Sequence, residues 1–251
     1  MTGNSVSIEL SQSGAVKRPT GKDVLDWRKT SIIHKAWENE GSAPLVRKLK
    51  KALSKGDAGP PEETVNHTLE RHHNYNGRPW CLGRDHFSYL KSRGLKPDHN
   101  FLDLGCGAMR TGIWVARYLD AGHYFGIDAH LPGLEAAANY EIPLHGLEEK
   151  RPRLLNNDQF DIGHFGVEFD WVFAFAVINH LSDELLDAAL SRVRKHLRPG
   201  GRLVLSPAPR KPMEWMEQKH GLKLSHSETR DCLIIDDKID WYEFQPVSAR
   251  P

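Results

Sequence analysis

Residues 101–119 read FLDLGCGAMRTGIWVARYL, which is a short apolar strand, a turn with two glycines, and an amphipathic helix. Gly105 and Gly107 stand where the strand turns into the helix, so the backbone there can approach a ligand that a side chain would exclude. Open α/β sheets bind their ligands beyond the carboxyl ends of the strands, and this turn lies at such an end. The stretch predicts a ligand-binding turn, with a purely structural turn as the alternative.

Asp128 ends the next expected strand and limits the kind of ligand. A carboxylate at that place can accept hydrogen bonds from both hydroxyl groups of a ribose. A dinucleotide-binding turn would follow the pattern G-x-G-x-x-G, but Arg110 stands where the third glycine would permit close packing of the helix. The turn therefore favours an adenosyl ligand over a dinucleotide with its pyrophosphate.

Strands and helices alternate along the chain on both sides of this turn. The expected strands are 101–104, 124–128, 153–155, 171–178 and 202–206, and the expected helices are 110–119, one that starts at 134–138, and 184–196. Such alternation implies a largely parallel sheet with right-handed crossovers. The end of the chain differs, because the segments 222–225, 231–235 and 239–244 look like strands joined by tight turns. This ending predicts an antiparallel edge of the sheet.

The chain divides into three segments. Residues 1–20 are polar and rich in serine and glycine, so we expect them to be mobile. Residues 21–93 have helical periodicity, with a last short helix at 84–93, and we expect them to form a helical N-terminal extension that acts as a lid. Residues 94–251 form the α/β domain.

Composition excludes several classes of partner. The 34 basic and 33 acidic residues give a net charge of +1, whereas duplex nucleic acid favours a strongly basic domain, so we expect no nucleic-acid partner. The three cysteines form no C-x-x-C pair, so neither a disulfide framework nor a zinc site is indicated. The start lacks the apolar stretch of a signal peptide and no run approaches 18 apolar residues, which predicts a cytoplasmic protein without stable membrane insertion.

Four segments carry a resemblance to a known family. LDLGCG, YFGID, FDWVFAFAVINHL and LRPGGRLVLS occur in this order at the spacing seen in class I S-adenosylmethionine-dependent methyltransferases, which the chain resembles over about residues 80–206. The lead-in to the glycine turn is also similar to that of a bacterial subgroup with the sequence LDIGCGSLRGG, from which Met109 and Thr111 depart. The resemblance implies S-adenosyl-L-methionine as the cofactor. It further implies a Rossmann-like, doubly wound, mostly parallel sheet of seven strands in the order 3-2-1-4-5-7-6, with an antiparallel C-terminal edge.

The resemblance also implies which residues hold the cofactor. Gly105 and Gly107 would line the methionine moiety, Asp103 would orient the loop, and Asp128 would hold the ribose. The full set of implied cofactor-binding positions is Asp103, Gly105, Cys106, Gly107, Arg110, Asp128, Ala129, Asp158, Gln159 and Ala176.

Three of these positions would have distinct roles. Asp158 would accept a hydrogen bond from the amino group of the adenine, with Asp161 as a competitor for that role. Ala176, at the end of the central strand, would face the cofactor with its backbone. Arg110 would either meet the methionine carboxylate or point into solvent.

His180 is the candidate catalytic residue. Methyl transfer from a sulfonium is an in-line displacement, so the protein aligns the acceptor, excludes water and, where needed, removes a proton. His180 follows the long apolar run 171–178, and histidine as a residue type suits general-base work at neutral pH. The alternative is that His180 only shapes its turn. We expect no metal ion, because Asp158, Asp161 and Glu168 are spread over a loop.

The acceptor is the least determined part of the function. Large apolar residues in two regions predict a roof over the site and thus a small-molecule acceptor, methylated on oxygen or nitrogen; these residues are Trp27, Trp37, Tyr75, Trp80, Met213, Trp215 and Met216. The alternatives are a peptide, protein or glycan acceptor, or a protein that binds the cofactor without catalysis. The oligomeric state is unknown from the sequence.

Overall fold

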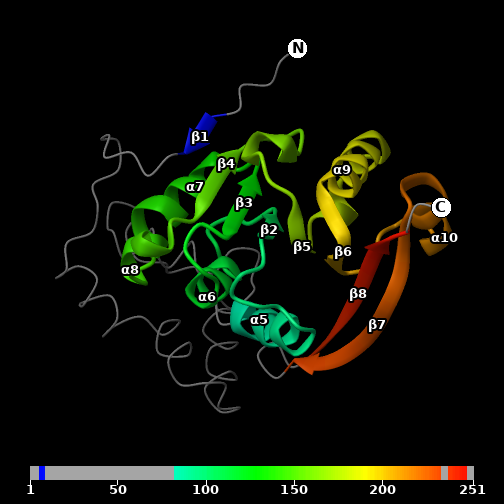
Figure 1. The fold of residues 1–251 in the computed structure, drawn as a ribbon, viewed down its shortest axis with the longest axis horizontal. Coiled ribbons are helices and arrows are strands. Elements are labelled where there is room, and N and C mark those ends of the chain that lie inside the picture. Colours follow the sequence, from blue (N-terminus) through cyan, green and yellow to red (C-terminus); the bar gives the residue numbers. More distant parts are fainter. Residues whose placement is uncertain (1–5, 9–81, 233–236, 248–251) are drawn as a thin grey trace, which may run out of the picture.

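The computed structural model describes residues 6–8, 82–232 and 237–247. In this part of the chain eight strands form one sheet in the order β1-β4-β3-β2-β5-β6-β8-β7 (Figure 1). The strands are β1 (Val6–Ile8), β2 (Phe101–Leu104), β3 (Tyr124–Asp128), β4 (Arg153–Asn156), β5 (Phe169–Phe175), β6 (Leu197–Ser206), β7 (Leu222–Cys232) and β8 (Asp237–Pro246).

Helices connect most of these strands. Within the described ranges the α-helices are α5 (Leu82–Ser92), α6 (Gly112–Tyr118), α7 (Leu131–Ala136), α8 (Ile142–Leu144), α9 (Asp183–His196) and α10 (Met213–His220). A π-helical stretch, η2 (Ala137–Glu141), follows α7, and the 3-10 helices are η3 (Glu148–Lys150), η4 (Ile162–Phe165) and η5 (Ile178–His180). Among the described residues, no helix is both long and apolar enough to cross a bilayer.

The centre of the sheet is parallel and buried. Strands β4, β3, β2, β5 and β6 run parallel to one another, and all four residues of β2 are buried. A strand that is covered on both faces needs a continuous apolar run, which explains why β2 and β5 are apolar along most of their length. Because parallel strands end at the same edge, the loops after β2, β3, β4, β5 and β6 all lie at the carboxyl edge of the sheet.

The expected strand order is confirmed. Without β1, the observed order β4-β3-β2-β5-β6-β8-β7 is the order 3-2-1-4-5-7-6 that the resemblance implies. The antiparallel C-terminal edge is confirmed as well, since β8 pairs antiparallel with both β6 and β7. Strand β1 is an addition: within residues 1–20, which we expected to be mobile, residues 6–8 form a strand that pairs antiparallel with β4. The rest of residues 1–81 lies outside the described part of the chain.

Three element boundaries differ from those expected. Helix α6 begins at Gly112 instead of Arg110, because residues 108–111 form a turn in which Met109 has a left-handed backbone (φ 65°). Strand β5 ends at Phe175 instead of Ile178, because Ala176 is left-handed (φ 55°) and a 3-10 turn follows. The two short strands expected at 222–225 and 231–235 are one strand, β7, whose pairing with β8 has a bulge near Ser225.

Two hydrophobic clusters cover the two faces of the sheet. The first contains buried residues of α5, α6 and α7, and the second contains those of η4, α9 and α10. Figure 1 shows these helices around the central strands and the long β7–β8 hairpin, whose far end lies beside α5. The fold thus has three layers, with helices on both faces of the sheet, as in other doubly wound α/β folds.

A buried ionic network ties α5 to the C-terminal hairpin. Glu243 of β8, only 1% exposed, accepts hydrogen bonds from Tyr89 (2.7 Å), Arg93 (2.6 Å) and Arg202 (3.1 Å). Burial and the hydrogen bond to Glu243 raise the pKa of Tyr89 above its ordinary range. The Tyr89 ring also stacks on Trp241, with 4.2 Å between ring centroids. Helix α5 is therefore packed firmly against the sheet, although the sequence analysis placed it at the end of the N-terminal extension.

Candidate cofactor site at the carboxyl edge of the sheet

Hydrogen bonds between neighbouring loops hold the carboxyl edge together. The N–H groups of Gly105 and Cys106 donate to the carbonyl oxygen of Ile127 at 2.8 and 3.2 Å, which joins the loops after β2 and β3. The N–H group of Asn157 donates to the Asp128 carbonyl (3.0 Å), which joins the loops after β3 and β4. The edge is thus a continuous set of loops in which the position of each depends on its neighbour.

The glycine turn requires glycine at its first position. Gly105 has a left-handed backbone (φ 69°), and a Cβ atom there would lie 2.3 Å from Cγ2 of Val177. Gly107 is also left-handed (φ 50°), and its N–H group donates a 2.7 Å hydrogen bond to Oδ2 of Asp128. The structure therefore brings the two predicted features, the glycines and the acidic end of β3, into direct contact.

Both oxygens of the Asp128 carboxylate are held by the backbone. Oδ2 accepts from Gly107 and Oδ1 accepts from the N–H group of His130, each at 2.7 Å. The side chain is half-buried. A carboxylate oxygen has two lone pairs, so each oxygen can accept a further hydrogen bond from a ligand hydroxyl.

Asp103 lies beneath the loop. Its side chain is only 4% exposed and accepts a 2.9 Å hydrogen bond from the hydroxyl of Tyr124. Burial raises the pKa of Asp103 to about 7, against the opposing effect of the Tyr124 hydrogen bond, and the nearby charge of Asp128 adds to the increase. The same tyrosine hydroxyl packs against Gly112, where a Cβ atom would lie 2.2 Å away. Asp103 is thus bonded to Tyr124, which packs against the start of α6 below the loop.

Cys106 also faces the protein interior. Its thiol is buried and packs against Gly126 of β3, where a Cβ atom would lie 2.7 Å from the sulfur. Burial raises the pKa of the thiol well above its ordinary value, so the side chain is a small neutral packing group. Only the backbone of this predicted residue is on the loop surface with which a ligand would interact.

An asparagine organises the loop after β4. Oδ1 of Asn157 accepts hydrogen bonds from the N–H groups of Gln159 and Asp161, both at 2.9 Å, which is an Asx-type turn. Asp158 and Gln159 are exposed on this turn. The carbonyl oxygen of Gln159 accepts from Arg192 of α9. The predicted adenine-side residues are therefore presented by a turn whose organising residue the sequence analysis did not single out.

Neighbouring Asn156 anchors Ala129. Its Nδ2 donates to the carbonyl oxygens of Asp128 (2.9 Å) and Ala129 (3.1 Å). Ala129 itself is exposed. The backbone that follows Asp128 is consequently fixed by β4, and a signal for this role was present in the sequence as the asparagine pair after the third strand.

Left-handed residues other than glycine gather at this edge. Met109, Phe160 and Ala176 have φ angles of 65°, 55° and 55°, and they lie in the loops after β2, β4 and β5. An L-residue in this conformation costs about 1–2 kcal/mol, and such strain clusters at functional sites. Ala176 is exposed, and its N–H group donates to the carbonyl oxygen of Ser206 (2.6 Å), which joins the loops after β5 and β6.

His180 closes the 3-10 turn that follows β5. Its N–H group donates to the carbonyl oxygen of Val177 (3.0 Å), and its side chain is exposed. Nε2 of the ring lies 3.2 Å from Nδ2 of Asn179. Val177 is the residue that packs on Gly105, so the turn with His180 and the glycine turn are adjacent.

Helix α5 supports the site in a way the sequence analysis missed. A Cβ atom on Gly83 would lie 1.9 Å from the carbonyl oxygen of Arg110, so the start of α5 touches the end of the glycine turn. His86, buried in α5, forms a 2.8 Å hydrogen bond with Thr111, and its ring lies 4.0 Å from that of Phe175 at the end of β5. These contacts link the glycine turn to β5 through α5.

The structure describes only some of the large apolar residues that were predicted to form a roof over the site. Trp27, Trp37, Tyr75 and Trp80 lie outside the described residues. On α10, Met216 is fully buried in the core, whereas Met213 and Trp215 pack against that core from a partly buried position.

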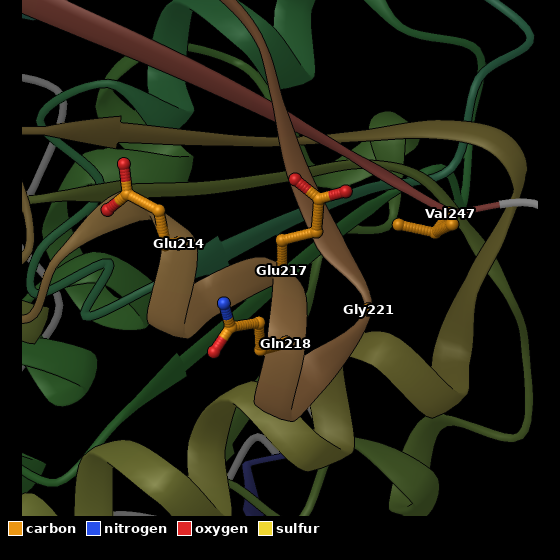
Figure 2. A pocket seen from close by; sticks show the side chains of 5 residues that line it. All are labelled: Glu214, Glu217, Gln218, Gly221 and Val247. Atoms are coloured by element: carbon orange, nitrogen blue, oxygen red, sulfur yellow. The ribbon is translucent and has the colours of Figure 1, made fainter.

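Other ligand sites are not prominent in the described part of the chain. No group of three or more histidine, cysteine, aspartate or glutamate side chains is arranged to hold a metal ion there. A surface hollow of about 480 Å³ is lined by Glu214, Glu217, Gln218, Gly221 and Val247. These residues are labelled in Figure 2. Val247 follows the end of β8, which runs antiparallel to β6, so this end of the hollow is at the amino edge of the parallel strands.

Comparisons with known proteins identify the same fold. Residues 102–203 match the family model of a methyltransferase domain. The fold is similar to that of magnesium protoporphyrin IX methyltransferase from Synechocystis PCC 6803, crystallised with S-adenosylmethionine, with 16% identity, a TM-score of 0.53, and 86% and 97% of the two chains covered. It is also similar to a Pyrococcus horikoshii OT3 protein (15% identity, TM-score 0.54, 69% and 95% covered) and to TrmN from Thermus thermophilus (17% identity, TM-score 0.55, 71% and 52% covered).

Proposed function

We propose that this chain transfers the methyl group of S-adenosylmethionine to an oxygen or nitrogen atom of a small-molecule acceptor, because residues 102–203 match a methyltransferase domain and the fold is similar to that of a methyltransferase crystallised with this cofactor. The observation that carries the cofactor site is the direct contact between the glycine turn and the Asp128 carboxylate. A nucleoside needs close backbone approach and an acceptor for its ribose hydroxyls, and here one short hydrogen bond holds the two together.

The residues present fit the cofactor. A Cβ atom at Gly105 would collide with Val177, so this position has no room for a side chain. A ligand at the turn would therefore contact the backbone of Gly105. Asp128 would bind the ribose, and the exposed turn with Asp158 and Gln159 would meet the adenine. Gly107 and the backbone of Ala176 would border the methionine moiety.

The cofactor supplies a methyl group bonded to a positively charged sulfur, so no covalent bond to the protein is needed. The tasks of this chain are to hold the cofactor, align the acceptor and exclude water. His180 is the side chain we assign to the acceptor, because its turn packs against the glycine turn through Val177 and its ring is exposed.

The charges near His180 support a small acceptor over a polyanion. Lys211 and Arg210, from the loop after β6, both pair with Asp183 at the start of α9, and Arg210 also donates to the carbonyl oxygen of Leu181. The surface beside His180 therefore carries charges of both signs, whereas a polyanionic acceptor favours a basic surface. A protein, peptide or glycan acceptor and binding without catalysis are the competing functions.

Label transfer separates these functions. The purified protein is incubated with methyl-labelled S-adenosylmethionine and a cell extract that has been divided into small-molecule and macromolecular fractions. We expect label in the small-molecule fraction. Label confined to the macromolecular fraction would overturn the small-molecule proposal, and S-adenosylhomocysteine binding without any transfer would overturn catalysis.

A further inference from the structure

The contact between Asn179 and His180 determines where the histidine carries its proton. The nitrogen of a side-chain amide can only donate a hydrogen bond, so Nε2 of His180, at 3.2 Å from Nδ2 of Asn179, must accept. A neutral imidazole has one N–H group and one accepting nitrogen. The proton of neutral His180 is therefore on Nδ1.

The burial of one amide atom of the partly exposed Asn179 favours this orientation of its amide. Its Oδ1 atom is buried and has no hydrogen-bond partner within the described ranges. Rotating the amide by half a turn would place the NH2 group, with two donors, in that same environment. Orphaned buried N–H groups are rarer in proteins than under-satisfied carbonyl oxygens, so the rotated amide is the less stable arrangement.

The turn keeps the two side chains together. Both residues belong to η5 (Ile178–His180), and the N–H group of His180 is bonded to the carbonyl oxygen of Val177 at 3.0 Å. Nδ1 of His180 has no hydrogen-bond partner among the residues that the structure describes, and the side chain is exposed. The nitrogen that carries the proton is thus the one left for a ligand.

We propose that Asn179 is a positioning residue that holds neutral His180 in its Nδ1–H tautomer, so that His180 donates a hydrogen bond to the acceptor and does not take a proton from it. The role toward the acceptor rests on the methyl-transfer function proposed above. In the transfer step the bond between sulfur and the methyl carbon breaks, sulfur keeps that electron pair, and the acceptor's lone pair forms the new bond. The proton on Nδ1 stays on His180 throughout, and the proton that the acceptor's O–H or N–H group loses passes to solvent water, which reaches the exposed side chain of His180.

Two other histidines provide internal references for the test. Nδ1 of His99 accepts from the indole N–H of Trp171 at 2.9 Å, and an indole can only donate, so neutral His99 carries its proton on Nε2. Nδ1 of His196 lies 2.9 Å from the carbonyl oxygen of Arg192, which can only accept, so His196 carries its proton on Nδ1. The chain therefore contains a reference for each tautomer.

The tautomers are distinguished by long-range proton–nitrogen NMR spectra of 15N-labelled protein at a pH where the histidines are neutral. We expect the pattern of His180 to match that of His196 and to differ from that of His99. Asn179→Asp replaces the donor by a carboxylate, which can only accept, and should convert His180 to the His99 pattern. Unchanged signals of His99 and His196 show that the variant is folded.

Two results would overturn the proposal. One is an Nε2–H pattern for His180 in the unaltered protein, and the other is an unchanged His180 pattern in a folded Asn179→Asp variant. Both are independent of turnover, so they are distinguishable from a failure of the methyltransferase function, which would show as absent binding of S-adenosylhomocysteine.

Turnover of the variants tests the donor role itself. The amide nitrogen of an asparagine at position 180 lies close to the position of histidine Nδ1 and can donate, but it cannot act as a base. His180→Asn should therefore exceed His180→Ala by about tenfold in turnover, the effect of one hydrogen bond. Equal, strongly reduced turnover of both variants would overturn the donor role.

Discussion

The N–H group of Gly107 and the carboxylate of Asp128 are joined by a 2.7 Å hydrogen bond, so the glycine turn after β2 and the acidic end of β3 form one unit before any ligand is considered. The second oxygen of the carboxylate is bonded to the N–H group of His130 at the same distance. A side chain held at both oxygens has little rotamer freedom left to lose, which lowers the entropic cost of binding.

Asp128→Ala should weaken S-adenosylhomocysteine binding by about 1.5–3 kcal/mol, the range for hydrogen bonds that involve a charged group. Calorimetry measures the affinity, and NAD serves as the competing ligand, for which we expect no comparable binding. Asp120→Ala is the matched control, because Asp120 is an exposed carboxylate that precedes β3, at the opposite edge of the sheet. An effect below about 0.3 kcal/mol would place Asp128 outside the site.

Gly105→Ala should reduce both cofactor affinity and stability. The new Cβ atom would lie 2.3 Å from Val177, and the left-handed backbone adds about 1–2 kcal/mol for an L-residue. Gly122→Ala controls for the backbone, because Gly122 is also left-handed (φ 85°) but has nothing within 4 Å of an added Cβ atom. Thermal unfolding should show a larger loss for Gly105→Ala, and equal losses would contradict the collision with Val177.

Asp103 should make the stability of the protein depend on pH. Burial raises its folded-state pKa to about 7, from the ordinary value of 3.8, so the native state binds this proton more tightly than the unfolded chain does. The resulting stabilisation is complete below about pH 4 and is lost as the pH rises through about 7. It amounts to about 4 kcal/mol, since one unit of pKa corresponds to about 1.4 kcal/mol.

Asp103→Asn isolates this contribution, because asparagine does not titrate and can still accept from Tyr124. Urea unfolding of both proteins between pH 4 and 8 gives the difference in free energy of unfolding, in which the effects of other groups cancel. The advantage of the unaltered protein over the variant should shrink as the pH rises. A difference that stays constant over this range would mean that Asp103 is ionised throughout.

Glu243→Gln should destabilise the protein by about 2–4 kcal/mol. The change leaves two arginines without the buried negative charge that they pair with, and the loss is below that for a fully buried pair because their side chains remain 28% and 31% exposed. Denaturant unfolding measures the effect. Asp183→Asn is the control, since its pairs with Arg210 and Lys211 are on the surface, and its unfolding midpoint should not move. A comparable loss in both variants would contradict a special role for the buried network.

The features that could be predicted from the sequence are those encoded locally. The glycine turn, Asp128 and the five parallel strands each depend on a short run of residues, and the strand order followed from the family resemblance. The roles of the individual cofactor residues and of His180 remain predictions.

The features that could not be predicted depend on residues far apart in the sequence or on backbone conformations that side chains do not reveal. Tyr89 and Glu243 are 154 positions apart, so nothing in the sequence of α5 indicates its partner. The left-handed backbone of Met109 is not indicated by its residue type, so the turn of residues 108–111 and the later start of α6 could not be predicted. The polar middle of β7 has no apolar alternation, which is why one strand looked like two.

The left-handed backbones of Met109, Phe160 and Ala176 have a consequence for attempts to engineer a more thermostable protein. Glycine in a loop is ordinarily a weakness to be removed, yet at Ala176, where the exposed side chain contributes little packing, glycine would relieve strain. The same relief would loosen the backbone that borders the methionine moiety in the proposed site. A substitution at this position is therefore expected to raise the melting temperature and lower turnover. Directed evolution that selects for melting temperature alone would be expected to reduce activity.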